Sequence, residues 1–204
     1  MDERAHDGTP ARHSYRSACV EAPRAKPTRI SLDNVDMTTL DPNLRIVLRD
    51  LTRTLDACGV RHAVVGGIAV VVYGWPRFTK DIDVLVGPEA YERLGGGEER
   101  LRDELPRSLG GVEIDYLPVS VGGVFLEVAF TRPVMSDGVP IAPAEVVVCT
   151  KLLRHAMRDR ADIVEILKAG LIDRASVRGF LSEHTPMLLR RWDALATQAD
   201  EENE

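Results

Sequence analysis

The sequence predicts an α+β fold, close to an α/β arrangement, in which helices flank a small mixed sheet and a helical C-terminal part follows. Two patterns lead to this prediction. Up to residue 142, short apolar runs bounded by glycine are interspersed with helical patterns, whereas beyond Pro143 the pattern is helical. The chain has 204 residues, 44% of them hydrophobic and 28% charged. It is therefore long enough for one core and a small addition.

The chain divides by composition into four predicted segments. Residues 1–36 are rich in Arg, Pro, Ala, Ser and Asp without an apolar period, which predicts a flexible N-terminal arm. Residues 37–142 form the predicted core, and residues 143–199 form the helical C-terminal part. The acidic tail, residues 200–204, is expected to fray.

The core is predicted to start with an amphipathic helix. Asp41 is a cap residue, Pro42 suits the first helical position, and apolar side chains then recur at helical spacing until Gly59. Strands are predicted over residues 61–65, 81–86, 112–119 and 123–130, with a short extended piece at 139–142. Helices or helical turns are predicted over residues 68–73, 88–94, 98–105, 143–157, 159–169, 173–183 and 185–198.

Composition also sets expectations about location and partners. No apolar run reaches the ~18 residues of a membrane span and no leader pattern opens the chain, so we expect a cytoplasmic protein without a membrane partner. Cys19, Cys58 and Cys149 have no metal-site spacing and are expected to be reduced thiols. The net charge of -6 gives no overall positive field, so a nucleic-acid contact would need a local arginine patch.

The most informative stretch of the chain is residues 64–86. Alternate side chains of a strand share a face, so Asp81 and Asp83 point the same way. Such carboxylate oxygens suit Mg²⁺, which completes its octahedron with water and substrate phosphates. The glycines Gly66 and Gly67 let the backbone approach a triphosphate and donate amide hydrogen bonds, with a short helix following. The stretch therefore predicts a site for a metal ion and a nucleotide.

These residues resemble a known family. The run G-G-I-A at residues 66–69, followed by R-F-T-K-D-I-D at 77–83, resembles the core motif of the DNA polymerase β-like nucleotidyltransferase superfamily. Within it, the pattern is closest to AbiEii-type and MenT-type toxin nucleotidyltransferases. The resemblance extends over residues 60–167: residues 114–117 are similar to the strand of the third carboxylate, and Lys151 with Asp159 and Asp162 is similar to the family's lysine and D-x-x-D helix.

The resemblance implies roles for the acidic residues. Asp81 and Asp83 would bind Mg²⁺, and a third carboxylate would complete the metal site and help to deprotonate the acceptor hydroxyl. Asp115 is the preferred third carboxylate, and Glu113 and Glu127 remain alternatives.

The resemblance also implies a nucleotide-binding set. Arg77 and Lys151 would neutralise phosphate charge, and Thr79 would offer its hydroxyl to the phosphates. Asp159 would orient the lysine. The family commonly has an arginine shortly before its D-x-x-D pair, where this chain has Ala156. Arginines flank that position at 154 and 158, and Arg158 is assigned to the nucleotide.

The resemblance implies an Mg²⁺-dependent nucleotidyltransferase that moves NMP from an NTP to an acceptor hydroxyl. The leading acceptor is the 3′ end of tRNA, as for a toxin with a cognate antitoxin protein. One alternative is transfer to a small molecule, as in antibiotic nucleotidyltransferases. Another is a catalytically silent binding module. Structural interpretations also stand: Lys151 as a solvated side chain, and Arg190-Arg191-Trp192 as an exposed helix face instead of an RNA contact.

Overall fold

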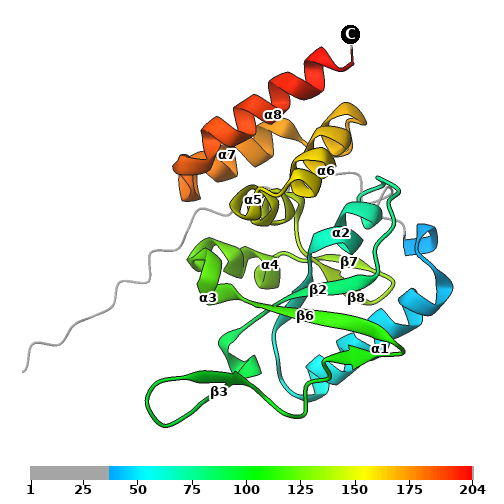
Figure 1. Ribbon diagram of the computed structural model, residues 1–204, viewed down its shortest axis with the longest axis vertical. Helices are drawn as coiled ribbons and strands as arrows, with labels where there is room; N and C mark the ends of the chain where they lie inside the picture. Colours follow the sequence, from blue (N-terminus) through cyan, green and yellow to red (C-terminus); the bar gives the residue numbers. More distant parts are fainter. Residues whose placement is uncertain (1–36, 204) are drawn as a thin grey trace, which may run out of the picture.

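The computed structural model describes residues 37–203 (Figure 1). The predicted N-terminal arm and Cys19 lie outside the described residues. Cys58 and Cys149 are free thiols. None of the helices in the described part combines the length and the apolar character that crossing a membrane requires.

The strands build one mixed sheet and one separate hairpin. In residues 37–203 they are β1 (His62–Val64), β2 (Asp81–Val86), β3 (Tyr91–Arg93), β4 (Glu99–Leu101), β5 (Ser108–Leu109), β6 (Val112–Pro118), β7 (Val134–Ser136) and β8 (Val139–Ile141). Six of these strands form a sheet of order β5-β6-β2-β1-β8-β7, and β3 pairs with β4. In the large sheet, β1 is parallel to β8 and β2 is parallel to β6, whereas the other pairs are antiparallel.

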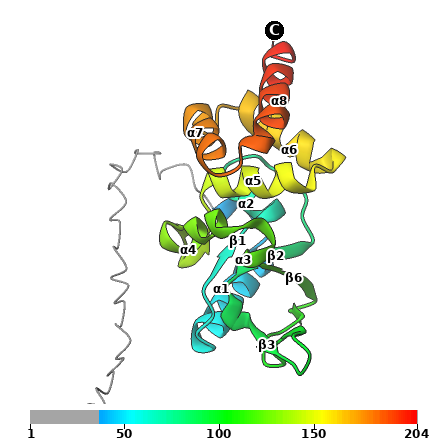
Figure 2. The ribbon, with the colours of Figure 1, turned by 90° about the vertical axis from the view of Figure 1, so that its left-hand side faces the viewer.

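The helices lie on both sides of this sheet. The α-helices are α1 (Pro42–Ala57), α2 (Gly66–Val72), α3 (Val119–Gly122), α4 (Val128–Thr131), α5 (Ala144–Arg154), α6 (Met157–Lys168), α7 (Arg174–His184) and α8 (Leu189–Glu201). The 3₁₀ helices are η2 (Met37–Thr39), η3 (Pro88–Ala90), η4 (Val124–Glu127) and η5 (Pro186–Leu188). Helices α5 to α8 gather on one side of the sheet and α1 lies on the other (Figures 1 and 2). The predicted α+β class is confirmed.

The predicted amphipathic helix is α1. The Asp41 carboxylate accepts hydrogen bonds from the backbone N–H of Asn43 at 2.8 Å and of Leu44 at 3.4 Å, which satisfies two amides of the first turn. Pro42 occupies the first turn, where no N–H donor is needed. The buried face of the helix consists of Leu44, Val47, Leu48, Leu51, Thr52 and Leu55. This face contacts β8 and fixes one side of the sheet.

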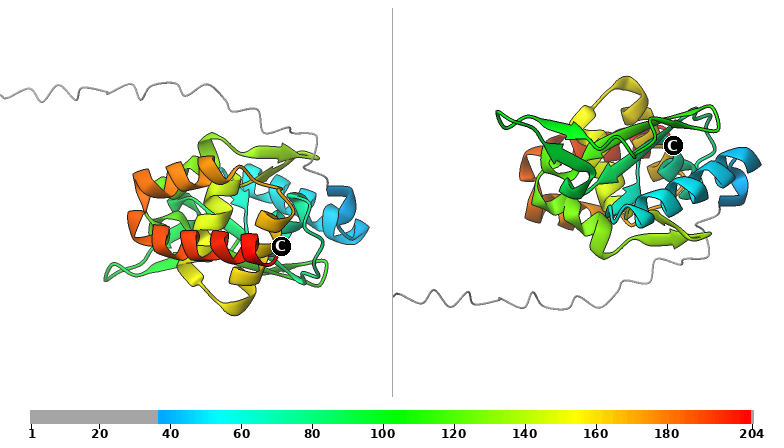
Figure 3. Two further views of the ribbon diagram at one scale, coloured as in Figure 1. Left: turned by 90° about the horizontal axis from the view of Figure 1, so that it is seen from above. Right: turned by 90° about the horizontal axis from the view of Figure 1, so that it is seen from below.

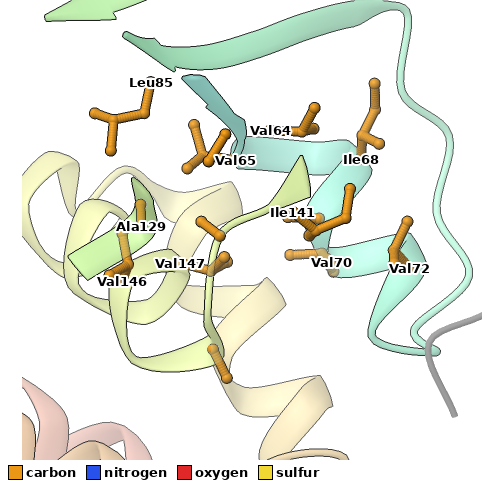
Figure 4. Close-up of a cluster of buried hydrophobic side chains, with 14 of the residues drawn as sticks. Val64, Val65, Ile68, Val70, Val72, Leu85, Ala129, Ile141, Val146 and Val147 are labelled. Carbon is orange, nitrogen blue, oxygen red and sulfur yellow. The ribbon is translucent and has the colours of Figure 1, made fainter. Parts of the chain in front are cut away.

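Another part of the same hydrophobic core holds α2 against β2 and α5. Figure 4 shows it with Val64, Val65, Ile68, Val70, Val72, Leu85, Ala129, Ile141, Val146 and Val147 labelled. The Tyr73 hydroxyl, just after α2, donates to the carbonyl of Ala142, just after β8, at 2.9 Å. Burial raises the pKa of Tyr73, so it remains a donor. Because α2 starts directly after β1, this packing also fixes the Gly66-Gly67 turn.

The helices predicted over residues 88–94 and 98–105 are wrong. A single turn of 3₁₀ helix, η3, is followed by the β3–β4 hairpin, which extends away from the body (Figures 1 and 3). Gly96 and Gly97 have positive φ angles of 98° and 87° and form the loop of the hairpin. Leu, Glu and Arg favour helices locally, but the glycine run allows the chain to reverse and pair with itself.

The strand predicted over residues 123–130 is also wrong. This segment forms η4 and α4, which follow the short helix α3. A short apolar run has no period that separates a buried strand from a buried helix, and this one packs beside β1 in helical form.

The C-terminal helices are confirmed with shifted ends. Helix α5 stops at Arg154 because His155 takes a left-handed conformation with φ of 52°, and α6 then starts at Met157. Helix α8 continues to Glu201, past the predicted end at residue 198. Ion pairs from Arg174 to Asp200 at 2.7 Å and from Lys168 to Glu202 at 3.1 Å hold its last turn. Seen from above, α7 and α8 lie next to each other (Figure 3).

Candidate active site

The parallel pair of strands β2 and β6 brings the acidic residues together. Asp81 is in register with Glu113, and Asp83 is in register with Asp115. Residues in register on parallel strands share a face, so these carboxylates lie on one face of the sheet. Asp83 is 8% exposed, whereas Glu113 and Asp115 are exposed. The site therefore combines one buried carboxylate, Asp83, with the exposed carboxylates Glu113 and Asp115.

The glycine turn touches this acidic face directly. Gly66 has a φ of +66°, and a Cβ atom built there would lie 1.8 Å from Oδ2 of Asp83. A Cβ atom on Gly67 would lie 2.7 Å from Oγ1 of Thr79. Both positions thus need glycine, because the side chains of the motif pack on the backbone of the turn.

We expect the Gly66→Ala variant to lose roughly 2–4 kcal/mol of stability, since it combines a left-handed backbone strain with a clash against Asp83. Gly59→Ala is the matched control, because Gly59 has a φ of +67° and nothing within 4 Å of a built Cβ atom. Urea denaturation of both variants measures the difference. Equal losses would show that Asp83 can move away without penalty.

The surroundings of Asp83 disfavour its charge. Burial raises the pKa of the Asp83 carboxyl, and the negative charge of Asp81 raises it further. The Arg154 guanidinium and a hydrogen bond from the Gly67 N–H lower this pKa, while Asp115 raises it. The balance is a raised pKa, so a positive charge bound between these carboxylates would relieve their repulsion.

Thr79 and Arg77 support the acidic face in this structure. The Thr79 hydroxyl donates to Oδ1 of Asp81 at 3.1 Å and so orients that carboxylate. Arg77 forms an ion pair with Asp162 of α6, and its side chain is 14% exposed. The phosphate contacts predicted for Thr79 and Arg77 stay predictions.

Lys151 is buried in an ion-pair cluster and is not a solvated side chain. Its side chain is 4% exposed. Its ammonium lies 2.7 Å from Oδ2 of Asp162 and 3.3 Å from Oδ1 of Asp159, and these two carboxylates are buried as well. Lys151 of α5 therefore contacts the Asp159–Asp162 pair of α6, as predicted, because the two helices pack against each other.

Arg154 connects this cluster to the acidic face. Its Nε lies 3.2 Å from Oδ2 of Asp159, and its Nη1 lies 3.7 Å from Oδ1 of Asp83. A small cavity of about 20 Å³ lies at the junction. Its lining consists of Val65, Gly66, Asp83, Leu117, Thr150, Lys151, Arg154 and Asp159.

The structure thus brings most of the predicted residues to one place. The set is Gly66, Gly67, Arg77, Thr79, Asp81, Asp83, Asp115, Lys151 and Asp159. Arg158 is exposed and forms no ion pair within residues 37–203. Glu127 is on η4 and pairs with Arg61 at 2.6 Å.

Sequence reasoning passed over Arg154 in favour of Arg158. The signal that distinguishes them is spacing: Arg154 follows Lys151 by three residues on α5, which places both side chains on one helix face. Arg158 lies beyond the break at His155.

The interpretation of residues 190–192 as an exposed helix face is wrong for Trp192, and the alternative RNA contact does not fit this residue either. Trp192 is 2% exposed and belongs to the core, so its ring offers no face to a base. Arg191 donates to the carbonyl of Leu152 at 2.7 Å and so satisfies an end of α5.

The donor set suits a hard cation. Asp81 and Asp83 offer only carboxylate oxygens, and the repulsion that raises the pKa of Asp83 falls when a cation is bound between them. The predicted three-carboxylate metal site of Asp81, Asp83 and Asp115 is not present as such, because among residues 37–203 no three or more His, Cys, Asp or Glu side chains are close enough to hold a metal ion by themselves. Mg²⁺ takes one or two protein carboxylates and completes its shell with water and phosphates.

Comparisons with known proteins add a distant structural likeness. No family model and no curated protein matches the sequence. Among solved structures, the chain is similar to the crystal structure of an antigenic nucleotidyltransferase-like protein from Paracoccidioides brasiliensis, with a TM-score of 0.42 and 16% identity. The match covers 79% of this chain and 94% of that chain. The function proposed next therefore depends on the residues of the site.

Proposed function

We propose that this protein is an Mg²⁺-dependent nucleotidyltransferase, which moves NMP from an NTP to an acceptor hydroxyl. One observation carries the proposal. Asp81 and Asp83 lie on the face of β2 that meets the Gly66-Gly67 turn and the basic residue Arg154, with Asp115 in register on β6. Carboxylates for a cation, a backbone turn and positive charge for phosphates are the parts that phosphoryl chemistry requires.

Each group has a defined task in this proposal. In the transfer, the acceptor oxygen forms a bond to the α-phosphorus while the bond to the β-phosphate breaks, and pyrophosphate leaves. A bound divalent cation supplies positive charge for the reacting oxygens. Asp81 and Asp83 hold that charge, and Thr79 keeps Asp81 oriented through its hydrogen bond. Asp115 is exposed and accepts the proton of the acceptor hydroxyl.

The lysine has a modified task. Because Lys151 is buried between Asp159 and Asp162, it holds α6 against α5 and contributes positive charge to the lining of the cavity. Arg77 has a similar place beside Asp162. We propose that these two cations act on the triphosphate from behind the glycine turn.

For the acceptor, we propose the 3′ end of tRNA, with a cognate antitoxin protein as partner. The support is the resemblance of residues 66–83 to AbiEii-type and MenT-type toxin nucleotidyltransferases. Helices α5 to α8 lie on one side of the sheet (Figure 2), and Arg154 at the end of α5 reaches Asp83, so an acceptor at the carboxylates would lie next to the C-terminal part.

The experiment is a transfer assay with each of the four α-labelled NTPs, Mg²⁺ and total tRNA, run in parallel with small hydroxyl-bearing antibiotics. Label transferred to tRNA supports both the proposed chemistry and the proposed acceptor. Label on a small molecule supports the chemistry but shows that the acceptor is that molecule and not tRNA. If no NTP transfers label to any acceptor, the silent-module interpretation holds instead. Asp83→Asn, which lacks one proposed metal ligand, is the negative control.

The choice of third carboxylate gives a further prediction. We expect Asp115→Asn to lower the transfer rate by about 10²-fold or more, the usual size of a lost general base, because Asp115 is in register with the buried Asp83. Glu113→Gln should have a smaller effect, since Glu113 is in register with Asp81 at the outer end of the strand. Glu127→Gln is the control, because Glu127 is paired with Arg61. A larger loss in Glu113→Gln would transfer the role to Glu113.

A further inference from the structure

Arg154 differs from the other cations of the site in its exposure. Its side chain is 55% exposed, whereas the side chains of Lys151 and Arg77 are 4% and 14% exposed. Removing Lys151 from its buried partners would leave Asp159 and Asp162 in the interior with one cation each. Arg154 can instead exchange its partners for water or another anion at little cost. It is therefore the movable cation of the site.

The partners of Arg154 are the two carboxylates that line the cavity. It lies 3.7 Å from Oδ1 of Asp83 and 3.2 Å from Oδ2 of Asp159. Asp83 is also a proposed metal ligand. A guanidinium and a divalent cation beside the same carboxylate repel each other, so binding of the cation at Asp83 works against the contact with Arg154.

The size of the cavity leads to the same conclusion. About 20 Å³ holds roughly one water molecule, whereas pockets for small molecules measure about 300–1,000 Å³. The cavity is thus too small to enclose a nucleotide unless lining groups move. Of the charged side chains that line the cavity, Arg154 is the exposed one and sits on the last residue of α5, next to the break at His155.

We propose that Arg154 is an exchangeable counter-ion: it neutralises Asp83 when no cation is bound, leaves when the cation binds, and then pairs with a phosphate of the nucleotide. This inference rests on the proposed function. In this role, Arg154 weakens the binding of the cation and strengthens the binding of the nucleotide. A purely structural arginine would not show these opposite effects.

The test measures binding of Mn²⁺ alone to the full chain, from the loss of the free-ion signal in electron paramagnetic resonance. We expect Arg154→Ala and Arg154→Gln to bind Mn²⁺ about threefold more tightly than the wild type, the size of a half-exposed ion pair. With Mg²⁺ present, the same variants should bind labelled NTP roughly tenfold more weakly, since a charge-assisted hydrogen bond is lost. Arg154→Gln keeps the first part of the side chain and a polar end without the charge, and so guards against misfolding.

Arg160→Ala is the matched control, because Arg160 is an exposed arginine of α6 that forms no ion pair within residues 37–203. It should leave both affinities unchanged. Unchanged Mn²⁺ affinity in Arg154→Ala and Arg154→Gln, or unchanged NTP affinity, would overturn the counter-ion role. If Asp83→Asn still abolishes Mn²⁺ binding in that case, the proposed metal site stands. If Mn²⁺ binding is also indifferent to Asp83→Asn, both proposals fail.

Discussion

Replacing Lys151 with alanine is expected to destabilise the fold by about 3 kcal/mol, the lower end of the range for breaking a buried ion pair. The lost ammonium is within 3.3 Å of Asp159 and 2.7 Å of Asp162, and both carboxylates are buried. Arg154 and Arg77 leave each of them one partner, which limits the loss. For a protein of this length the melting temperature should fall by roughly 10 °C.

Lys80→Ala is the control for this prediction, because Lys80 is exposed and forms no ion pair in the described part of the chain. It should change the stability by less than about 0.5 kcal/mol. A melting temperature for Lys151→Ala within a degree or two of the wild type would contradict the structural role. The kinetics of Lys151→Ala are informative only at a temperature where the variant is folded.

The second large effect is a loss of transfer activity in Asp83→Asn without a loss of stability. Even outer partners of a metal ligand are worth about 10–100-fold, so removing the charge of a direct ligand should lower the rate by at least about 100-fold. The amide has nearly the volume of the carboxylate and carries no charge to desolvate. Because the folded protein raises the pKa of Asp83, a neutral side chain is preferred there, and the melting temperature should stay level or rise.

Transfer kinetics and thermal unfolding of the same preparation check both parts of this prediction. Asp103→Asn is the control, since Asp103 is an exposed residue that pairs with Arg100 at 3.3 Å. Near-normal transfer by Asp83→Asn would show that the Asp83 carboxylate has no role in the reaction. A large fall in melting temperature would instead show that Arg154 and Gly67 stabilise the Asp83 carboxylate more than burial disfavours it.

Elements that depend on local signals were predicted well. Helix α1 has its cap, its proline and its apolar period within seventeen residues, from Asp41 to Ala57. Strands β1, β2 and β6 and helices α5 to α8 also follow from such signals. The wrong predictions are in segments whose structure depends on contacts outside the local sequence. Residues 88–105 contain helix-forming residues, but they form a hairpin. Residues 123–130 are an apolar run that fits a helix as well as a strand.

The candidate site divides in the same way. Gly66, Gly67, Asp81 and Asp83 lie within eighteen residues, and strand alternation alone places both carboxylates on one face. That Asp115, and not Glu127, lies beside Asp83 follows from the parallel pairing of β2 with β6, which joins strands far apart in the sequence.

The surroundings of the basic residues were decided only by the tertiary structure. A lysine after three valines is compatible with solvent or with the interior, and only the packing of α5 on α6 buries Lys151 between Asp159 and Asp162. Likewise, the left-handed turn at His155 ends α5 so that Arg154, and not Arg158, reaches Asp83. The sequence alone determines which residues are available for the chemistry and which of them share a face of one strand or helix, because strand and helix periods are local. Burial and partner choice depend on contacts between distant segments, which a local period does not contain.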